Sequence, residues 1–345
     1  MVVSTKDFDL FLSKVNSGLN GFSEAIVPRK ANTSSNKSAI LRFERSKEEN
    51  NISLNSYRTI DPLKILFYLA REKVYPVDEV AKKRVIVGVK ACDLKALLLL
   101  DKAMLEGGFT DPAYYNWRKN TLIISSDCDE ICETCHCNLV GGKPYSEKGF
   151  DLNISRVNNH YVLTTGSEQG ISFLDLLKKE IPVQNSSADD AKTVSEKRNH
   201  VLNLLKEQNK ENIRPNEYSE FRKVETKVWR EESEECVGCG ACTNICPTCY
   251  CLILNDESIN EQFVKVRGYD SCQWFGYARV AGGGSPRHKM TERFRNRYLC
   301  KFDYMNHNFG EIGCTGCGRC TEACTAQIDF RKALKNISKV VLEKF

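Results

Sequence analysis

Histidine is scarce in this chain of 345 residues, which has only five, and no Ser–His–Asp or paired-carboxylate arrangement stands out. Acid–base and nucleophilic catalysis therefore have no visible machinery. No G-x-G-x-x-G segment follows a predicted strand, and no G-x-x-x-x-G-K-S/T segment occurs, which excludes the usual dinucleotide and P-loop cradles. These absences favour a chain that is not itself catalytic, with any flavin or nicotinamide chemistry on a partner.

Long apolar runs are also missing. The longest, 65–70 and 96–100, are too short to span a bilayer, and Asp7 lies where a signal peptide would have a basic segment before its apolar one. We therefore expect a cytoplasmic protein with no membrane span. The net charge of +5 is modest, and aromatic residues do not alternate with basic ones, so nucleic-acid binding is not indicated.

Cysteine, in contrast, is abundant, with 17 residues. A chain of this length can bury a core without disulfides, and cytosolic thiols stay reduced, so we expect metal ligands or redox groups. The cysteines fall into three groups: Cys92 with Cys128 to Cys137, then Cys236 to Cys272, then Cys300 to Cys324.

The first group lies in a region that reads as α/β. β-branched residues predict strands over 84–89 and 121–125, and the segment 93–105 between them predicts a helix. Such a unit is normally a right-handed parallel crossover. Cys92 and Cys128 follow the two strands, so both should emerge at the carboxyl edge of a parallel sheet, where ligand sites occur in α/β folds.

A domain boundary is expected after this region. Polar residues 184–197 predict a loop leading into a charged helix that ends near residue 208, and a second helix is expected over 216–229. Beyond residue 232 no strand pattern of useful length is apparent. The sequence therefore predicts an α/β domain over 1–215 and a mostly α-helical ferredoxin domain with two clusters over 216–345.

Two ferredoxin motifs dominate the second domain. Both fit C-x2-C-x2-C-x3-C, and in such pairs the fourth cysteine of each motif ligates the other cluster. The sequence predicts one 4Fe–4S cluster on Cys236, Cys239, Cys242 and Cys324, and a second on Cys314, Cys317, Cys320 and Cys246. Zinc knuckles, the alternative, use two C-x2-C pairs separated by a longer loop. Thr325 stands where proline normally follows the fourth cysteine.

A third 4Fe–4S cluster is predicted at the sheet edge. The preferred ligands are Cys92, Cys128, Cys135 and Cys137, with Cys132 as the alternative. A zinc site, free thiols and a redox disulfide stay open. Cys132 to His136 also matches C-x-x-C-H, the attachment motif of c-type haem. The absence of an export signal argues against haem.

The remaining features are less specific. Cys249, Cys251 and Cys272 could share a cluster with Cys135 or Cys137, or form a thiol pair near an electron path. Cys300 is expected to be a small buried hydrophobe. Nine Lys and Arg residues between 265 and 301 predict a solvated face, or a surface that attracts an acidic flavoprotein or an anionic ligand.

The ordered cysteine pattern resembles a known family. The segments that carry the resemblance are Val87 to Leu94, Asp127 to Cys137, Cys246 to Cys251, Asp270 to Cys272, Ala281 to Gly283 and the closing motif. They occur in this order in the β subunits of cytoplasmic sulfhydrogenases and in the corresponding iron–sulfur subunit of anaerobic sulfite reductase. The segment from Arg58 to Glu72 is similar as well.

The resemblance implies an iron–sulfur electron-transfer subunit of a multi-subunit oxidoreductase. Its partners would be an FAD- and NAD(P)-binding subunit and a terminal catalytic subunit of sirohaem or nickel–iron type. The eight motif cysteines match the family pattern. An iron–sulfur sensor or scaffold without electron-transfer duty is the alternative.

Overall fold

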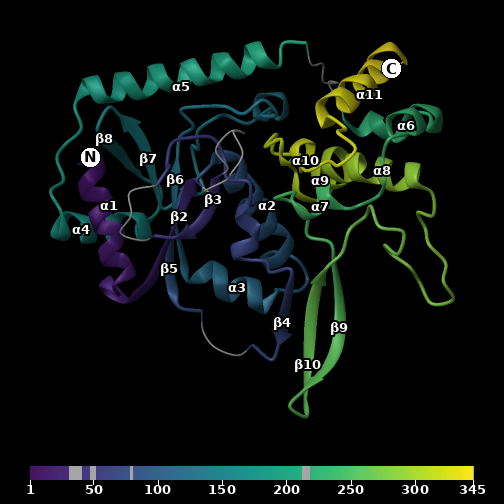
Figure 1. The fold of residues 1–345 in the computed structure, drawn as a ribbon, viewed down its shortest axis with the longest axis horizontal. Helices are drawn as coiled ribbons and strands as arrows, with labels where there is room; N and C mark the ends of the chain where they lie inside the picture. The colour runs from purple at the N-terminus through teal and green to yellow at the C-terminus, as the bar shows by residue number, and fades with distance from the viewer. Residues whose placement is uncertain (31–40, 47–51, 78–80, 212–217, 345) are drawn as a thin grey trace.

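The structure, a computed structural model, describes residues 1–30, 41–46, 52–77, 81–211 and 218–344. The predicted domain boundary at 215/216 lies outside these residues. The sheet-forming part and the part with the ferredoxin motifs lie side by side along the longest axis of the molecule (Figure 1). None of the helices in the described residues is long and apolar enough to cross a membrane.

The amino-terminal part alternates strands and helices. Its strands are β1 (Val2–Ser4), β2 (Phe22–Lys30), β3 (Leu41–Arg45), β4 (Arg71–Tyr75), β5 (Lys83–Val89), β6 (Thr121–Ser126), β7 (Leu152–Val157) and β8 (His160–Thr165). Its helices are α1 (Thr5–Asn16), α2 (Ala91–Leu105), α3 (Pro112–Lys119), α4 (Glu168–Glu180) and α5 (Ala188–Gln208), with short 3₁₀ turns at Leu19–Gly21, Leu63–Leu66 and Cys137–Val140.

Seven of these strands form one sheet in the order β1-β8-β7-β6-β5-β2-β3. The four central strands β2, β5, β6 and β7 are parallel, and the outer pairings are antiparallel. The predicted strand–helix–strand unit is confirmed as β5, α2 and β6, although α3 also lies in the connection. The α/β prediction for this region is thus confirmed.

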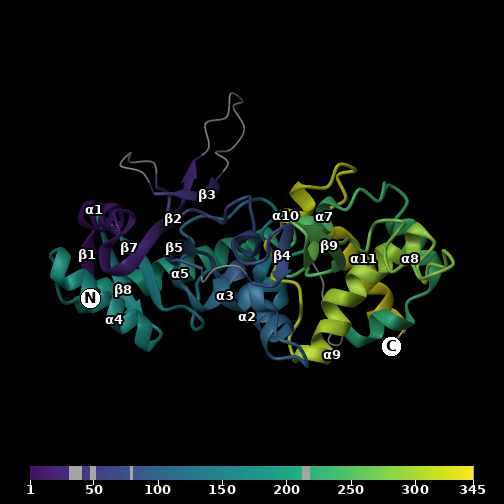
Figure 2. The same cartoon turned by 90° about the horizontal axis from the view of Figure 1, so that it is seen from below.

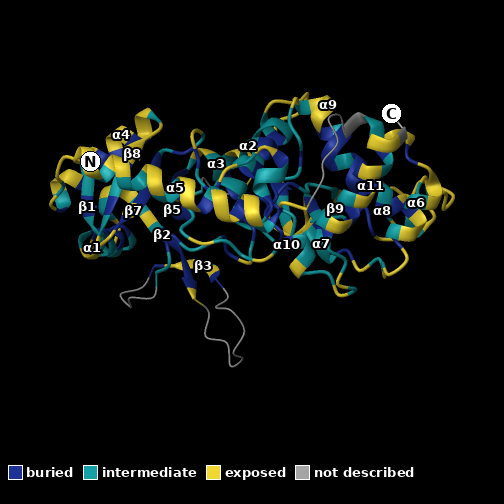
Figure 3. Cartoon of the chain, turned by 90° about the horizontal axis from the view of Figure 1, so that it is seen from above, coloured by how far each residue is buried: buried dark blue, intermediate teal, exposed yellow. Residues whose placement is uncertain are grey.

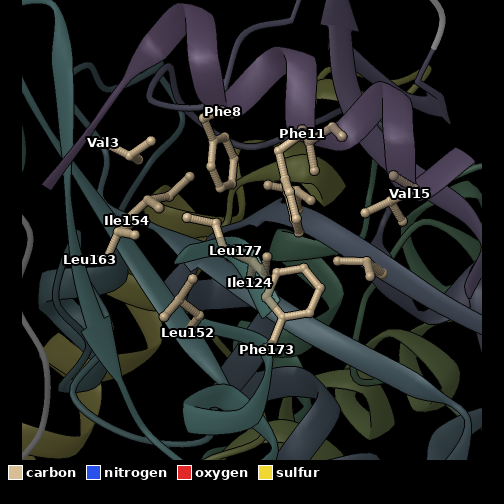
Figure 4. Close-up of a cluster of buried hydrophobic side chains, with 14 of the residues drawn as sticks. Val3, Phe8, Phe11, Val15, Ile124, Leu152, Ile154, Leu163, Phe173 and Leu177 are labelled. Atoms are coloured by element: carbon tan, nitrogen blue, oxygen red, sulfur yellow. The ribbon is translucent and has the colours of Figure 1, made fainter. Parts of the chain in front are cut away.

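Helices cover both faces of the sheet. On one face Phe8 and Phe11 of α1 meet Phe173 and Leu177 of α4 over Ile124 and other strand residues, as Figure 4 shows. On the other face α2 and α3 bury Leu94, Leu97, Leu100, Met104 and Tyr114. Their burial fixes α2, and with it the position of Cys92 at its first turn.

Helix α5 begins earlier than the polar composition suggests. Ser187 caps it, accepting from the backbone N–H of Asp190, whose carboxylate in turn accepts from the Ser187 N–H, a capping box. The helix then runs along the molecule toward the second part (Figure 1). Its last turn therefore reaches the cysteine loop 128–137.

The carboxy-terminal part combines helices with a long hairpin. Its elements are a 3₁₀-helix (Tyr218–Lys223), α6 (Thr226–Glu232), α7 (Ala241–Asn244), β9 (Leu252–Ile259), β10 (Gln262–Tyr269), α8 (Met290–Leu299), a short π-helix (Cys300–Tyr304), α9 (Met305–Phe309), α10 (Arg319–Glu322) and α11 (Phe330–Lys344). The part predicted to be mostly α-helical thus also contains two eight-residue strands, which no sequence pattern revealed. Strand β10 pairs with β4 of the amino-terminal part, so the two parts share a three-stranded sheet.

A separate aromatic core holds the helices of the second part together. Trp229, Tyr298, Phe302 and Phe330 are buried in it, and the rings of Tyr298 and Phe330 stack at 4.6 Å between centroids. Figures 2 and 3 show α8 and α11 next to one another at the far end of the molecule, with buried residues on their inner sides. This core carries the ferredoxin motifs on its surface toward the sheet.

Candidate functional site

The second ferredoxin motif places three cysteines around a tight turn. Burial raises the pKa of Cys320 to about 12; Arg297 opposes this, and the thiols of Cys317, Cys314 and Cys246 raise it further. Cys246 is thus a neighbour of this motif although 67 residues separate it from Cys314 in sequence. The structure brings together the four cysteines predicted for the second cluster.

The first motif has a comparable arrangement. Burial raises the pKa of the Cys242 thiol, and Cys236 is among the thiols that add to this effect. The Thr325 hydroxyl lies 3.8 Å from Cys239 Sγ and donates to it, which brings the residue after Cys324 to this motif. Thr325 therefore has a contact of its own in place of the usual proline.

Arg297 of α8 lies between the two motifs and is buried. Burial alone would lower its pKa, but the thiols of Cys242, Cys320 and Cys246 hold it well above the ordinary value. Its guanidinium also lies 4.7 Å from the centre of the Phe330 ring. A permanent positive charge therefore faces cysteines of both predicted clusters.

Cys92 and Cys128 of the predicted third site follow β5 and β6 at the carboxyl edge of these parallel strands, as expected. Burial raises the pKa of Cys137 to about 12, and Cys128 and Cys317 raise it further. Cys92 has the same two thiols as neighbours. Three of the four preferred cysteines, Cys92, Cys128 and Cys137, are therefore close together and next to the second motif.

Cys132 and Cys135 form a close pair, with 3.1 Å between their sulfurs. The hydrogen bond from Cys135 lowers the pKa of Cys132 to about 6 despite its burial, and Arg58, whose Nη2 lies 3.6 Å from the sulfur, adds to this shift. Gln208 at the end of α5 donates to the carbonyls of both cysteines. The two sulfurs are thus held against one another at the end of α5.

His136 is enclosed between the third site and the second motif. Its Nδ1 donates to the Thr134 carbonyl at 2.9 Å, its Nε2 lies 3.9 Å from Cys314 Sγ, and its backbone N–H donates to the Gly316 carbonyl. Burial lowers its pKa to about 4, so the ring is neutral at pH 7. Because both ring nitrogens are engaged, the C-x-x-C-H segment does not fit a c-type haem.

Glycines allow the second motif to contact the cysteine loop. Gly316 and Gly318 have φ of +67° and +74°, and a Cβ on Gly316 would lie 2.4 Å from the Cys137 backbone. Only glycine combines this backbone conformation with so close an approach. The first motif repeats the pattern, since Gly238 and Gly240 lie against residues 271–274.

Two buried arginines lock the third site to the second motif. Arg319, next to Cys320, forms a fully buried ion pair with Asp93, next to Cys92, at 2.7 Å. Arg58 donates to the Cys317 carbonyl at 2.6 Å and forms an ion pair with Glu322. These arginines were not among the residues predicted from sequence.

The basic run from 265 to 301 is not simply a solvated face, which corrects that expectation. Four of its nine cations are buried: Arg267, Arg293, Arg297 and Lys301. Arg267 is paired with Glu72 and Asp111, whereas Arg297 and Lys301 face thiols. Several cations of this run therefore interact with buried carboxylates or thiols rather than with solvent.

Three of the four unassigned cysteines influence one another, and Cys300 is not an isolated hydrophobe. Burial raises the pKa of Cys251, Cys272 and Cys300. Each of these thiols also raises the pKa of another: Cys300 that of Cys251, Cys272 that of Cys300, and Cys251 that of Cys272. A hydrogen bond between thiols lowers the pKa of Cys246 and raises that of Cys249. Cys249 is thus a neighbour of Cys246, while Cys251, Cys272 and Cys300 are neighbours of one another.

All 17 cysteines are free thiols. Among the described residues, no three or more His, Cys, Asp or Glu side chains converge as ligands of a single metal ion. A cavity of about 380 Å³ adjoins the third site, with Cys92 and Cys137 in its wall together with Lys95, Lys143 and Lys148.

The donor set fits iron–sulfur clusters. Thiolates are the usual ligands of such clusters, and the cysteines here have buried cations beside them that would balance a negatively charged centre. Cys242, Cys246 and Cys320 around Arg297 are the clearest instance.

Comparison with known proteins gives the same result. Residues 235–328 match the family described as 4Fe-4S dicluster domain. The chain is similar to the sulfhydrogenase 2 subunit beta of Pyrococcus furiosus, with 33% identity over 308 residues that cover 86% of this chain and 88% of the relative. No solved structure matches the chain. The chain therefore belongs to the sulfhydrogenase β-subunit family, an iron–sulfur electron-transport subunit with a 4Fe–4S dicluster domain.

Proposed function

We propose that this chain relays electrons between an FAD- and NAD(P)-binding subunit and a terminal catalytic subunit within a cytoplasmic oxidoreductase complex. The terminal subunit would be of the sulfite reductase or nickel–iron hydrogenase type. The observation that carries the proposal is the continuous series of neighbouring cysteines from Cys92 to Cys242, with buried cations beside them. When bound, a 4Fe–4S cluster supplies reversible one-electron chemistry.

The two motif clusters would use the predicted ligands. We assign Cys236, Cys239, Cys242 and Cys324 to one cluster and Cys314, Cys317, Cys320 and Cys246 to the other. The proximity of Cys246 to Cys314 and Cys320, and of Thr325 to Cys239, supports this exchange of fourth ligands. Arg297, near Cys242 and Cys320, would stabilise negative charge at both.

The third cluster would use Cys92, Cys128, Cys137 and one member of the pair Cys135 and Cys132. Cys137 and Cys92 both have Cys317 as a neighbour. His136 Nε2 at 3.9 Å from Cys314 Sγ adds a second contact between the two sites. The ion pair of Asp93 and Arg319 would keep the third cluster at a fixed distance from the cluster of the second motif.

The two ends of this series differ in their surroundings. Cys239 of the first motif is exposed, and so are the nearby side chains Val237, Trp274 and Phe275. At the other end the cavity with lysines in its wall opens beside Cys92 and Cys137. One partner would dock on the exposed apolar side chains at the first end, and a partner with an acidic surface would dock on the lysines at the other. Two different partners could then exchange electrons with one chain.

The test is reduction of the anaerobically purified full chain by an NAD(P)H-linked flavoprotein, followed by absorption and EPR spectroscopy. We expect bleaching of the cluster absorption and signals of reduced 4Fe–4S clusters. Dithionite, which reduces clusters without a protein partner, is the control. Reduction by dithionite but not by the flavoprotein would contradict the relay and favour the sensor or scaffold alternative.

A further inference from the structure

Lys301 is a buried cation without a carboxylate partner in the described residues. It lies in the short π-helix after α8, and only 3% of its surface is exposed. Its Nζ donates to the Thr248 hydroxyl at 2.7 Å, and Met305 Sδ lies 3.9 Å from it. Arg267 and Arg319, which are also buried, pair with carboxylates instead. A buried charge without a counter-charge is unfavourable, so the surroundings of Lys301 call for a negative charge that no carboxylate there supplies.

The Thr248 hydroxyl connects Lys301 to a predicted cluster ligand. Its oxygen lies 3.4 Å from Cys246 Sγ, and the hydroxyl donates to the Gly313 carbonyl at 2.6 Å. Thr248 is only 1% exposed, so these contacts are shielded from solvent. The lysine ammonium therefore reaches the Cys246 sulfur through a single hydroxyl group.

Lys301 also contacts the segment that leads into the second motif. The Gly313 N–H donates to the Lys301 carbonyl at 2.6 Å, and Gly313 immediately precedes Cys314. A π-helix such as the one that carries Lys301 is rare and occurs frequently at functional sites. Cys246 and Cys314, two predicted ligands of the second cluster, are thus connected through Lys301 and Thr248.

The first predicted cluster has different surroundings. The residue after its fourth cysteine is Thr325, whose exposed hydroxyl donates to Cys239 Sγ at 3.8 Å. Arg297 faces cysteines of both predicted clusters, so its charge does not distinguish one from the other. The contacts of Lys301, in contrast, involve the second cluster's ligand Cys246 and the residue before Cys314.

We propose that Lys301 raises the reduction potential of the cluster held by the second motif and Cys246, with Thr248 as its hydrogen-bonded link to that ligand. The inference rests on the proposed iron–sulfur function and names a residue that positions charge within it. Reduction adds one electron to a cluster that four thiolates already make negative. A fixed cation in a buried environment stabilises that added charge, so loss of the cation makes this cluster harder to reduce.

The test is an EPR-monitored redox titration of the anaerobically purified full chain and of Lys301→Met, which keeps an unbranched side chain but removes the charge. We expect the equilibrium constant for reduction of one cluster to fall about tenfold or more, which lowers its midpoint potential by about 59 mV or more. The other motif cluster should be unchanged. The affected signal should be the one that Cys314→Ser also alters. Lys301→Arg, which keeps the charge, should restore most of the potential.

Lys102→Met is the matched control. Lys102 pairs with Glu311, which is close to Gly313 in sequence, but both side chains of this pair are partly exposed. Removal of this charge should leave both potentials unchanged. An unchanged midpoint in Lys301→Met would overturn the proposal. Equal shifts in the methionine and arginine variants would also overturn it, since the effect would then come from packing rather than charge.

If Lys301→Met does not keep its iron, Thr248→Val takes its place in the titration, because it removes the linking hydroxyl and leaves the lysine charge in position. We expect a lower midpoint potential of the same cluster, and an unchanged midpoint would overturn the proposal. These outcomes leave the proposed function intact. A wild-type chain without iron would instead contradict the proposed function itself.

Discussion

At the scale of residues, buried lysine and arginine side chains lie beside the cysteine thiols. Lys90 donates to the Leu54 carbonyl and to Ser126 beside Cys128, Arg58 reaches Cys132, and Arg297 faces Cys242 and Cys320. A buried thiolate loses its hydration, and a fixed positive charge nearby offsets that loss. Charge at these positions therefore matters more for ligand chemistry than for packing.

Gly316→Ala tests the contact between the second motif and the cysteine loop. The left-handed φ of +67° costs a non-glycine residue about 1–2 kcal/mol. The Cβ would also lie 2.4 Å from the Cys137 backbone, which adds roughly 1–3 kcal/mol of overpacking. We expect a lower thermal unfolding midpoint and loss of iron from the sites next to Gly316.

Gly282→Ala is the matched control. Its φ of +83° is also left-handed, but nothing lies within 4 Å of an added Cβ. It should therefore incur only the conformational cost and keep its iron. Equal effects of the two substitutions would mean that the close approach at Gly316 does not matter.

At the scale of elements, the hairpin β9–β10 joins the two parts of the chain. Figure 1 shows it projecting away from the helices, while β10 pairs with β4. Arg267 on β10 is fully buried and paired with Glu72 of β4 and with Asp111, the residue that caps α3. This cation therefore fixes the hairpin on the amino-terminal part.

Arg267→Met should destabilise this junction strongly. Removing the guanidinium leaves the Glu72 and Asp111 carboxylates without their partner in a buried place, at a cost of about 3–5 kcal/mol. The measurement is thermal unfolding combined with limited proteolysis of the hairpin, which should be cleaved faster.

Lys265→Met, two residues away on the same strand, removes a partly exposed ion pair with Asp256 and should change stability by less than about 1 kcal/mol. If the two variants behave alike, Arg267 does not hold the hairpin in place.

The hairpin also shows where sequence interpretation fails at this scale. No residue of β9 is buried, so the strand has no alternation of apolar and polar residues that a pattern could reveal. The unit β5, α2 and β6 was predictable because its buried β-branched strands carry a strong pattern. Helix α5 was placed too late because its capping box lies within a segment whose composition reads as a loop.

At the scale of the whole molecule, the sequence predicts cluster ligands but gives no sign of the buried charges that surround these cysteines. Cysteine spacing identifies the motif residues because three ligands come from one turn. The partners of Arg319, Lys64 and Arg267 lie far away in sequence, so a local view treats them as surface charge. The same limit made Cys300 look isolated, since its neighbours come from the hairpin base.

The molecule places its cysteines where the two parts meet. Cys92 and Cys128 lie at the sheet edge, the ferredoxin motifs lie on the helical core, and Arg319, Arg58 and His136 connect the two regions. Electron transfer weakens steeply with distance, so an arrangement that fixes neighbouring sites against one another suits a relay. The account therefore requires that iron occupies these sites together in the intact chain.

The most direct measurement of that claim is the content of iron and acid-labile sulfide in the anaerobically purified full chain, with EPR spectra after reduction. The account predicts at least about eight irons with matching sulfide for the two motif clusters, and about twelve with the third. Zinc without labile sulfide, or iron close to zero in a folded chain, would contradict it.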